Sequence, residues 1–125
     1  MNLPRRKVIV VDDAGPVVVL CVNVLQALGY LVKGANRGEA ALDLLRREPF
    51  DLMIVDYKMP GLNGFQVLTA ARELCPDLLS VLITGHGTPE IMREAEKLRF
   101  DGVLPKPFTS NELRHVVEAA FAGKE

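Results

Sequence analysis

The sequence predicts a doubly wound α/β fold, in which helices cover both faces of one five-stranded parallel sheet. Two patterns indicate it: short apolar runs typical of strands buried on both faces and, between them, segments with helix start signals. Such alternation favours parallel strands, because each helix carries the chain back to the sheet edge where the next strand starts. With 125 residues, 49% of them apolar, the chain suits one folded domain over residues 1–125.

Five segments are predicted strands. Three are short runs rich in β-branched residues, and two are weaker because polar residues or glycine interrupt them. In chain order, the predicted strands are Lys7–Val11, Tyr30–Ala35, Leu52–Val55, Val81–Ile83 and Gly102–Leu104. The second and the fifth are the two weaker ones.

The predicted helices begin at residues that can cap a first turn. At three starts, Asn or Thr is followed three residues later by Glu or Gln, and at the fourth Thr is followed by Pro. These starts are Asn36-x-x-Glu39, Asn63-x-x-Gln66, Thr109-x-x-Glu112 and Thr88-Pro89. Gly29 and Pro76 are stop signals, so we expect the helices that precede them to end there.

The segment Pro16–Leu28 is ambiguous, since its valines favour a strand. We predict a helix, because apolar residues at helical spacing form one stripe that can face the sheet. The stripe comprises Val17, Leu20, Cys21, Val24, Leu25 and Leu28. Val18, Val19 and Val22 remain as a second apolar strip on another face, which a buried helix does not require.

Charged and hydroxyl side chains come at the ends of the predicted strands. In parallel sheets the carboxyl ends of the strands meet at one edge, where ligands bind. We therefore expect five side chains together there: Asp12, Asp13, Asp56, Thr84 and Lys106. Close carboxylates repel one another unless a cation joins them, and oxygen ligands suit Mg²⁺. A metal, a lysine and a hydroxyl around a spare carboxylate are typical of phosphoryl transfer to that carboxylate.

Charge and composition exclude several function classes. The 15 basic and 16 acidic residues give a net charge of −1, which argues against a nucleic-acid-binding surface. The longest stretch that is both uncharged and mostly apolar, Ala14–Leu28, is interrupted by Pro16, Asn23 and Gln26, whereas a membrane span needs about 20 apolar residues in a row. No secretory signal opens the sequence, so we expect a cytoplasmic protein without a membrane partner. Cys21 and Cys75 lack metal-ligand spacing and are expected to be free thiols.

Four sequence blocks resemble the receiver domain of two-component response regulators. They are Val8-Ile-Val-Val-Asp12-Asp13, the segment Phe50–Gly64 with Asp56 and Met59-Pro60, Leu82-Ile-Thr84-Gly85, and Lys106-Pro107-Phe108. Together they cover essentially the whole chain in the family's order. The resemblance implies the flavodoxin-like (βα)5 arrangement with strand order 2-1-3-4-5, which the residue spacing alone does not give.

The resemblance also implies which residues hold the phosphoryl group. Asp56 would be the phosphoacceptor. Lys106 would contact the phosphoryl group, and Thr84 would bind one of its oxygens and move on activation. The bond between Lys106 and Pro107 would be cis.

The same resemblance implies a Mg²⁺ site. Asp13 and Asp56 would be ligands of the metal, with the backbone carbonyl of Lys58 as a third. Asp12 would act on the metal through water and through its charge.

The partners implied by the resemblance are a phosphodonor and an output protein. A histidine kinase or a histidine phosphotransfer protein would dock on the first helix, and we expect the strip Val18, Val19 and Val22 to be its docking face. The alternatives for this strip are an apolar surface without a partner and a homodimer contact. Because no output domain follows Glu125, the readout is a downstream protein, a homodimer, or the rest of a longer chain. The fourth helix and the fifth, Asn111–Phe121, would carry that contact; the fifth has Leu113, Val116, Val117, Ala120 and Phe121.

The sequence departs from the family at the position three residues before Lys106. That position is usually aromatic and here is Val103, which has no ring to turn inward on activation. We expect Phe100 to be a core residue instead. Lys58 and His86, each two residues after a site residue, are expected at the rim, where they would affect the lifetime of the phosphate.

Three other functions compete with a phosphoryl-accepting switch. A phosphatase that works through an aspartyl phosphate needs an acid two residues after its nucleophile, and Lys58 occupies that position, so no enzymatic activity beyond autophosphorylation and autodephosphorylation is expected. A nucleotide-binding module needs a glycine-rich phosphate loop, which the sequence lacks. A degenerate receiver that acts only as a phosphorylation-independent scaffold remains the alternative, although the five-residue set is intact.

Overall fold

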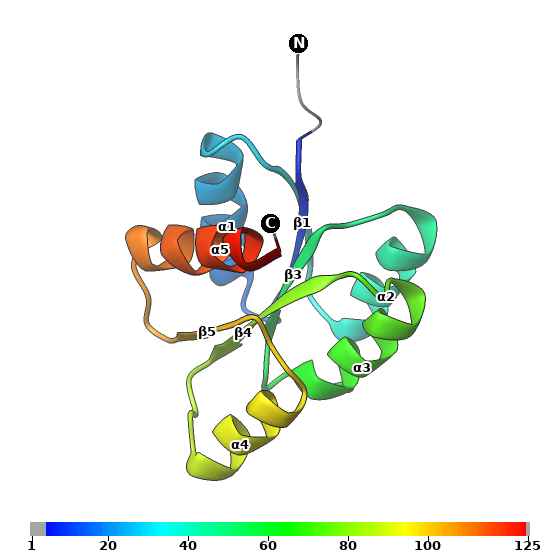
Figure 1. Cartoon of the computed structure of the whole chain (residues 1–125), viewed down its shortest axis with the longest axis vertical. Coiled ribbons are helices and arrows are strands. Elements are labelled where there is room, and N and C mark those ends of the chain that lie inside the picture. Colours follow the sequence, from blue (N-terminus) through cyan, green and yellow to red (C-terminus); the bar gives the residue numbers. More distant parts are fainter. Residues whose placement is uncertain (1–4, 125) are drawn as a thin grey trace.

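The computed structural model of the chain describes residues 5–124 (Figure 1). Strands and helices alternate through this part of the chain, as the sequence pattern predicts. In order, the elements are β1 (Lys7–Val11), α1 (Gly15–Ala27), β2 (Leu31–Ala35), α2 (Gly38–Arg47), β3 (Leu52–Asp56), α3 (Gly64–Leu74), β4 (Leu79–Thr84), α4 (Pro89–Lys97), β5 (Gly102–Pro105) and α5 (Ser110–Lys124). None of the helices within residues 5–124 is long and apolar enough to cross a membrane.

The five strands form one parallel sheet in the order β2-β1-β3-β4-β5, which confirms the predicted fold class and strand order. The chain reverses direction across the sheet beside β1, because β2 lies on one side of β1 and β3 on the other. In open sheets this is the place where ligands bind, beyond the carboxyl ends of the strands. Pro105, which has no backbone N–H to donate, lies in the edge strand β5.

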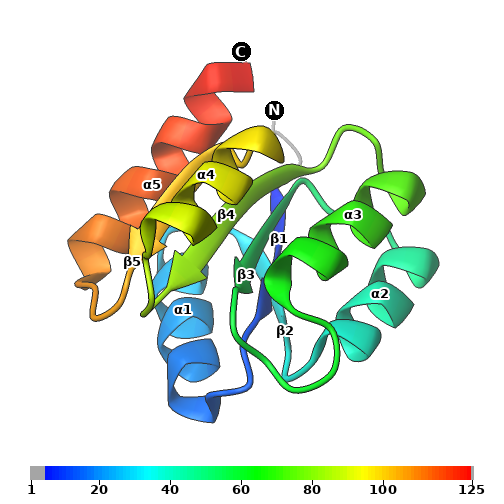
Figure 2. The same cartoon turned by 90° about the horizontal axis from the view of Figure 1, so that it is seen from below.

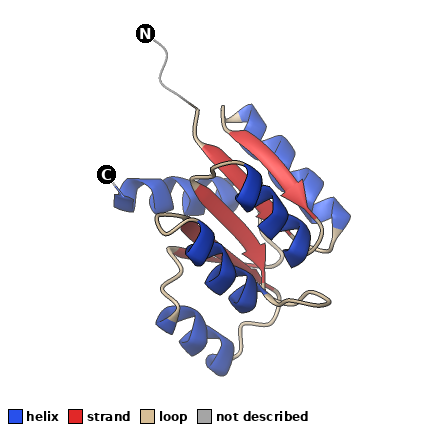
Figure 3. Ribbon diagram, turned by 90° about the vertical axis from the view of Figure 1, so that its right-hand side faces the viewer, coloured by secondary structure: helices blue, strands red, loops and turns tan. Residues whose placement is uncertain are grey.

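Helices cover both faces of the sheet (Figures 1 and 3), and each face carries its own hydrophobic core. Alternate strand residues point to opposite faces, so Val8 and Val10 pack against α1 and α5, while Ile9 and Val11 pack against α2 and α3. The helix α4 stands apart from the α2–α3 pair, at the end of the molecule near β4 and β5 (Figures 1 and 2). The molecule is therefore three layered, with one helix less firmly held than the others.

Three of the four predicted helix starts are confirmed. Asn63 and Gln66 exchange side-chain and backbone hydrogen bonds of 2.9 Å each at the start of α3. At the start of α5, Thr109 and Glu112 exchange the corresponding hydrogen bonds, of 2.8 and 3.1 Å. At the start of α4, the Thr88 side chain caps the helix directly before Pro89. The capping box expected at Asn36 is wrong. The backbone stays extended through Arg37, so α2 begins at Gly38 and Asn36 lies one residue too early to cap it.

The ambiguous first segment is a helix, as predicted, and it begins at Gly15. Its buried residues are Cys21 and Leu25. The predicted apolar stripe was too wide, because Leu20 and Leu28 at its two margins are 39% and 44% exposed. The helix lies very close to β2: a Cβ atom at Gly34 would come 2.5 Å from Val18 Cγ1. That close approach explains why a glycine faces Val18 at this point of β2.

The expectation that the apolar residues of the last helix form a partner face is wrong for most of them. Leu113, Val117, Ala120 and Phe121 are buried in the core that α5 shares with α1 and the sheet. They stabilise the fold and are not accessible to a partner. The two thiols, Cys21 and Cys75, are free, as predicted.

Candidate functional site

The charged and hydroxyl residues predicted to meet do so at the carboxyl ends of β1, β3, β4 and β5. Asp56 and Thr84 are the last residues of their strands, and Asp12 and Lys106 directly follow theirs. A pocket of about 210 Å³ opens at this edge. Its lining residues are Asp13, Asp56, Lys58, Thr84, Gly85, His86 and Lys106. The site is thus built from four separate stretches of chain that only the parallel sheet brings together.

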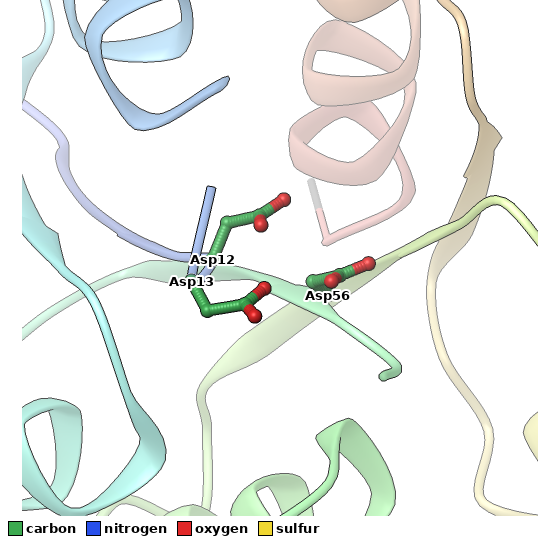
Figure 4. A group of neighbouring side chains, drawn as sticks. All are labelled: Asp12, Asp13 and Asp56. Atoms are coloured by element: carbon green, nitrogen blue, oxygen red, sulfur yellow. The ribbon is translucent and has the colours of Figure 1, made fainter. Parts of the chain in front are cut away.

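The carboxylates of Asp12, Asp13 and Asp56 form a compact cluster (Figure 4). One oxygen from each lies within 4.8 Å of the other two. Asp12 is fully buried and Asp56 is 4% exposed, whereas Asp13 is open to solvent. Burying like charges this close is unfavourable without a cation. Three carboxylate oxygens with one side open to water are a donor set that fits Mg²⁺, which prefers oxygen ligands and keeps several waters.

Lys106 supplies the positive charge of the cluster. Its Nζ atom lies 3.0 Å from Asp12 Oδ2 and 3.5 Å from Asp56 Oδ1. Burial alone would lower the pKa of Lys106, but the ion pairs with Asp12 and Asp56 outweigh burial and raise the pKa above its usual value. The ammonium therefore stays charged, and it bridges the two buried carboxylates.

Burial also acts on Asp56. It raises the pKa of Asp56 to about 6, with a further rise from the Asp12 carboxylate, while Lys106 opposes both. Asp12 is held in a different way, since its Oδ1 atom accepts a 2.9 Å hydrogen bond from the backbone N–H of Ala14. Of the two buried carboxylates, Asp56 is the one that faces the pocket.

A glycine holds the turn after Asp56 in place. The backbone N–H of Gly64 donates a 2.8 Å hydrogen bond to the carbonyl of Tyr57, and a Cβ atom at Gly64 would come 2.6 Å from the carbonyl oxygen of Asp56. Any larger residue would push α3 away from the end of β3. Gly64 therefore fixes the distance between this helix and the carboxylate at the centre of the site.

Thr84 and His86, from the end of β4 and the loop after it, also line the pocket. Thr84 is buried, and its Oγ1 atom accepts a 3.0 Å hydrogen bond from the backbone N–H of His86. The side chains of His86 and Lys58 are exposed at the rim, as predicted. The carbonyl of Thr84 accepts a 2.9 Å bond from the N–H of Lys106, which links the ends of β4 and β5, and the Lys106–Pro107 bond is cis.

Two features of this region were not foreseen from the residues. The ion pair between Lys106 and Asp12 was not predicted, because sequence reasoning placed the lysine only against a bound anion. The aromatic cluster beside Asp56, described below, has no local sequence signal. Phe100 packs against the core, as expected, and Val103 is half-buried in β5.

Comparison with known proteins decides the family. The sequence model of the response regulator receiver domain matches residues 8–118. The chain belongs to this family. Receiver domains bind Mg²⁺ through an acidic cluster of the kind formed here by Asp12, Asp13 and Asp56.

Among its relatives, this receiver is 29% identical to sporulation initiation phosphotransferase F of Bacillus subtilis over 91% of this chain and 92% of that protein. It is 30% identical to the chemotaxis protein CheY of Pseudomonas aeruginosa, over 92% and 95% of the two chains. The solved structure of the chemotaxis protein CheY4 of Vibrio cholerae superimposes with a TM-score of 0.88 at 28% identity, over 94% of this chain and 99% of that one. Receiver domains of this kind are signalling switches that work with histidine kinases or phosphotransfer proteins and with downstream targets.

Proposed function

We propose that this receiver takes a phosphoryl group from a histidine kinase or a histidine phosphotransfer protein onto Asp56, with Mg²⁺, and signals through the change of conformation that follows. The observation that supports the proposal most is the convergence of Asp12, Asp13, Asp56, Thr84 and Lys106 around one pocket. A scaffold that works without phosphorylation would not need these five groups together, so the degenerate-receiver alternative is not favoured.

The chemistry follows from the groups that line the pocket. A carboxylate oxygen of Asp56 attacks the phosphorus of a phosphohistidine; a P–O bond forms and the P–N bond breaks, with its electron pair returning to the imidazole nitrogen. Lys106 lies beside Asp56 and would donate to a phosphoryl oxygen. The Thr84 hydroxyl would donate to another, because it only accepts from the N–H of His86 and its own proton remains free. When bound, Mg²⁺ would neutralise charge on the transferred oxygens.

The metal would be held by Asp13, Asp56 and the backbone carbonyl of Lys58. Asp12 would act from behind them through water and through its charge, since its own oxygens face Ala14 and Lys106. We propose no activity on an external substrate. The residue two after Asp56 is Lys58, an amine and not the carboxylic acid that a phosphatase of this type uses to protonate its leaving group, so only autophosphorylation and autodephosphorylation remain.

The phosphodonor would dock on α1. Val18, Val19 and Val22 line an apolar groove of about 540 Å³ between α1, the end of β2 and the start of α2. The groove begins at Gly15, two residues after Asp13, so a helix seated there would reach the phosphoacceptor pocket. No charged residue occurs in α1 (Gly15–Ala27), which leaves this surface without a group that repels an apolar partner.

The output partner, or a second copy of this chain, would contact α4 and the exposed residues of α5, in the cytoplasm. The exposed side chains of α4 include Met92 and several charges of both signs, which are typical of a reversible contact rather than a permanent one.

The test uses phosphoramidate, a small phosphodonor, with and without Mg²⁺, and intact-mass measurement. We expect one phosphoryl group per chain, formed only with Mg²⁺ and absent from Asp56→Asn. Asp43→Asn, an exposed aspartate far from the pocket, is the matched control and should label like the wild type. Labelling without Mg²⁺, or labelling that survives Asp56→Asn, would contradict the proposal.

A further inference from the structure

Three aromatic rings from three separate elements lie in contact beside the phosphoacceptor. Tyr57 directly follows Asp56, Phe65 is the second residue of α3, and Phe100 lies in the turn between α4 and β5. The ring centroids of Tyr57 and Phe65 are 4.7 Å apart, and those of Phe65 and Phe100 are 6.0 Å apart. Tilted pairs at these distances attract one another. We call these three residues the ring cluster.

The backbone of Tyr57 is tied directly to the site. Its N–H donates a 2.9 Å hydrogen bond to Ile83 in β4, and its carbonyl accepts from Gly64 at the start of α3. Under the proposed function, Tyr57 lies between two groups that respond to phosphorylation, the Asp56 carboxylate and the Lys58 carbonyl. An adjustment of this turn when the phosphoryl group and metal bind would therefore move the backbone that carries the ring of Tyr57, which packs against Phe65.

Two rings of the cluster face α4, the helix with the fewest buried side chains in the described part of the chain. Within the described chain, Ala95 is the only buried residue of α4 (Pro89–Lys97). A groove of about 470 Å³ separates α4 from α3. Tyr57 and Phe65 line one wall of the groove, and Ile91, Glu94 and Lys97 are among the residues of the other. The rings and α4 thus face each other across space into which α4 can move.

The C-terminal end of α4 is fixed, unlike the rest of the helix. The guanidinium group of Arg72, in the last turn of α3, donates to the carbonyls of Leu98 and Arg99, the latter at 2.8 Å. Arg99 has a φ of 58°, a left-handed conformation that is strained for arginine and that this bond helps to hold. Phe100 follows at once. A helix held at one end and loose along its length moves by pivoting about the held end.

The usual aromatic residue of β5 is replaced by Val103, which has no ring to rotate. We propose that the ring cluster takes over this part of the switch: Tyr57, Phe65 and Phe100 are positioning residues that transmit the change at Asp56 through α3 to α4, which pivots about the contact with Arg72. This inference rests on the proposed function. Such coupling requires an element with two arrangements whose balance both sites shift, and we assign that role to α4, of which Ala95 is the only buried residue within the described chain.

The test compares Phe65→Leu, which removes the central ring, with Tyr30→Leu, which removes the ring stacked 5.6 Å from Phe121 on the other face of the sheet. Tyr57→Leu, which removes a half-buried ring outside α3, is a second variant, so the test does not depend on how well α3 tolerates the first. Each protein is measured with and without beryllium fluoride and Mg²⁺, by hydrogen exchange of the α4 amides and by phosphoramidate labelling of Asp56.

In the wild type and in Tyr30→Leu we expect beryllium fluoride to change the exchange rates in α4 by at least about threefold. In Phe65→Leu and Tyr57→Leu we expect labelling of Asp56 within about twofold of the wild type, but a change in α4 below about 1.5-fold. A full wild-type response of α4 in both ring variants would overturn the inference, as would an equal loss in Tyr30→Leu. If phosphoramidate does not label Asp56 of the wild type, the proposed function fails, and this inference with it. If Asp56 is labelled but beryllium fluoride leaves α4 of the wild type unchanged, this inference alone is overturned.

Discussion

The helices α1 and α4 flank the same pocket and are built in opposite ways. No Asp, Glu, Lys or Arg occurs among the 13 residues of α1, and two of its side chains are fully buried against the sheet. In contrast, α4 carries five charged residues among nine and buries only Ala95 within the described chain. Apolar burial holds a helix in place, whereas charges on most sides keep it solvated and weakly held.

This difference assigns the two helices different tasks in a switch. A docking surface serves best when it is the same before and after phosphorylation, and the rigid α1 meets that requirement. The surface that a downstream partner recognises must differ between the phosphorylated and unphosphorylated states at a small free-energy cost. The helix α4 meets this requirement, because few contacts are lost when it moves. The predictions below test this division, beginning with the largest effect.

The first prediction concerns how firmly each helix is held. Leu25→Ala in α1 removes a fully buried side chain and should lower the free energy of unfolding by about 3 kcal/mol. Ile91→Ala in α4 removes a half-buried side chain beside an open groove and should lower it by less than about 1 kcal/mol. Urea unfolding of the two variants gives both values. Equal losses would show that α4 is packed as firmly as α1.

The second prediction concerns docking. Val19 in α1 is 59% exposed and Met92 in α4 is 37% exposed, so a glutamate at either position leaves the core intact. Val19→Glu should slow phosphotransfer from the kinase or phosphotransfer protein about 30-fold, equivalent to about 2 kcal/mol, because it places a charge in the apolar contact. The rate with phosphoramidate should not change, because that donor needs no docking.

Met92→Glu is the matched control for Val19→Glu. It should leave phosphotransfer from the protein donor at the wild-type rate. If both substitutions slow the donor equally, the docking surface extends over both helices and the proposed division is wrong. If neither does, the donor does not use the α1 groove.

The parts of the molecule that sequence predicted are those that depend on local patterns or on strand topology. Short apolar runs located the strands, Asn63 and Gln66 located the start of α3, and the strand ends brought Asp56 together with Lys106. Strand limits were less well predicted where a polar residue is buried. The fourth strand begins at Leu79 rather than Val81, because Ser80 is fully buried inside it.

What the sequence did not reveal depends on contacts between elements far apart in the chain. Arg72 meets the carbonyl of Arg99, 27 residues later, and nothing near either residue indicates the other. The ring cluster likewise joins Tyr57 and Phe100 only through the folded chain. The prediction that Leu113 contacts a partner is wrong for a related reason. In a sequence, an apolar helix residue that faces a partner looks the same as one that faces the core, and only the packing distinguishes the two.

The third prediction concerns Mg²⁺, which should affect the region of α1 but not α4. At ten times its dissociation constant, Mg²⁺ should raise the free energy of unfolding by about 1.4 kcal/mol, because it binds the folded cluster of carboxylates. Asp13→Asn should lose most of this gain, whereas Asp43→Asn should keep it. Mg²⁺ alone should slow hydrogen exchange in the turn before α1 and leave α4 unchanged. Equal stabilisation of both variants would mean that the cluster is not the binding site.

The fourth prediction has the smallest effect and concerns a contact remote from both helices. Glu48, at the end of α2, forms ion pairs with Lys7 in β1 and with Lys33 in β2, the latter at 2.7 Å. Hydrogen bonds from Lys33 and then Lys7 lower the pKa of Glu48 below its ordinary value of 4.5. A lowered pKa means that the ion pairs stabilise the folded state above that value, and that the stabilisation disappears as the pH falls through the lowered pKa.

Glu48→Gln should therefore unfold at a lower urea concentration than the wild type at pH 7, and the difference should shrink steadily once the pH falls below about 4.5. Added salt should reduce the difference at pH 7, since the pairs are partly exposed. Because Glu48 joins α2 to the edge of the sheet, the substitution should leave the response of α4 to beryllium fluoride unchanged. If the two proteins still unfold at different urea concentrations at low pH, Glu48 acts through packing rather than charge. If the substitution weakens the response of α4, overall stability rather than the ring cluster governs α4.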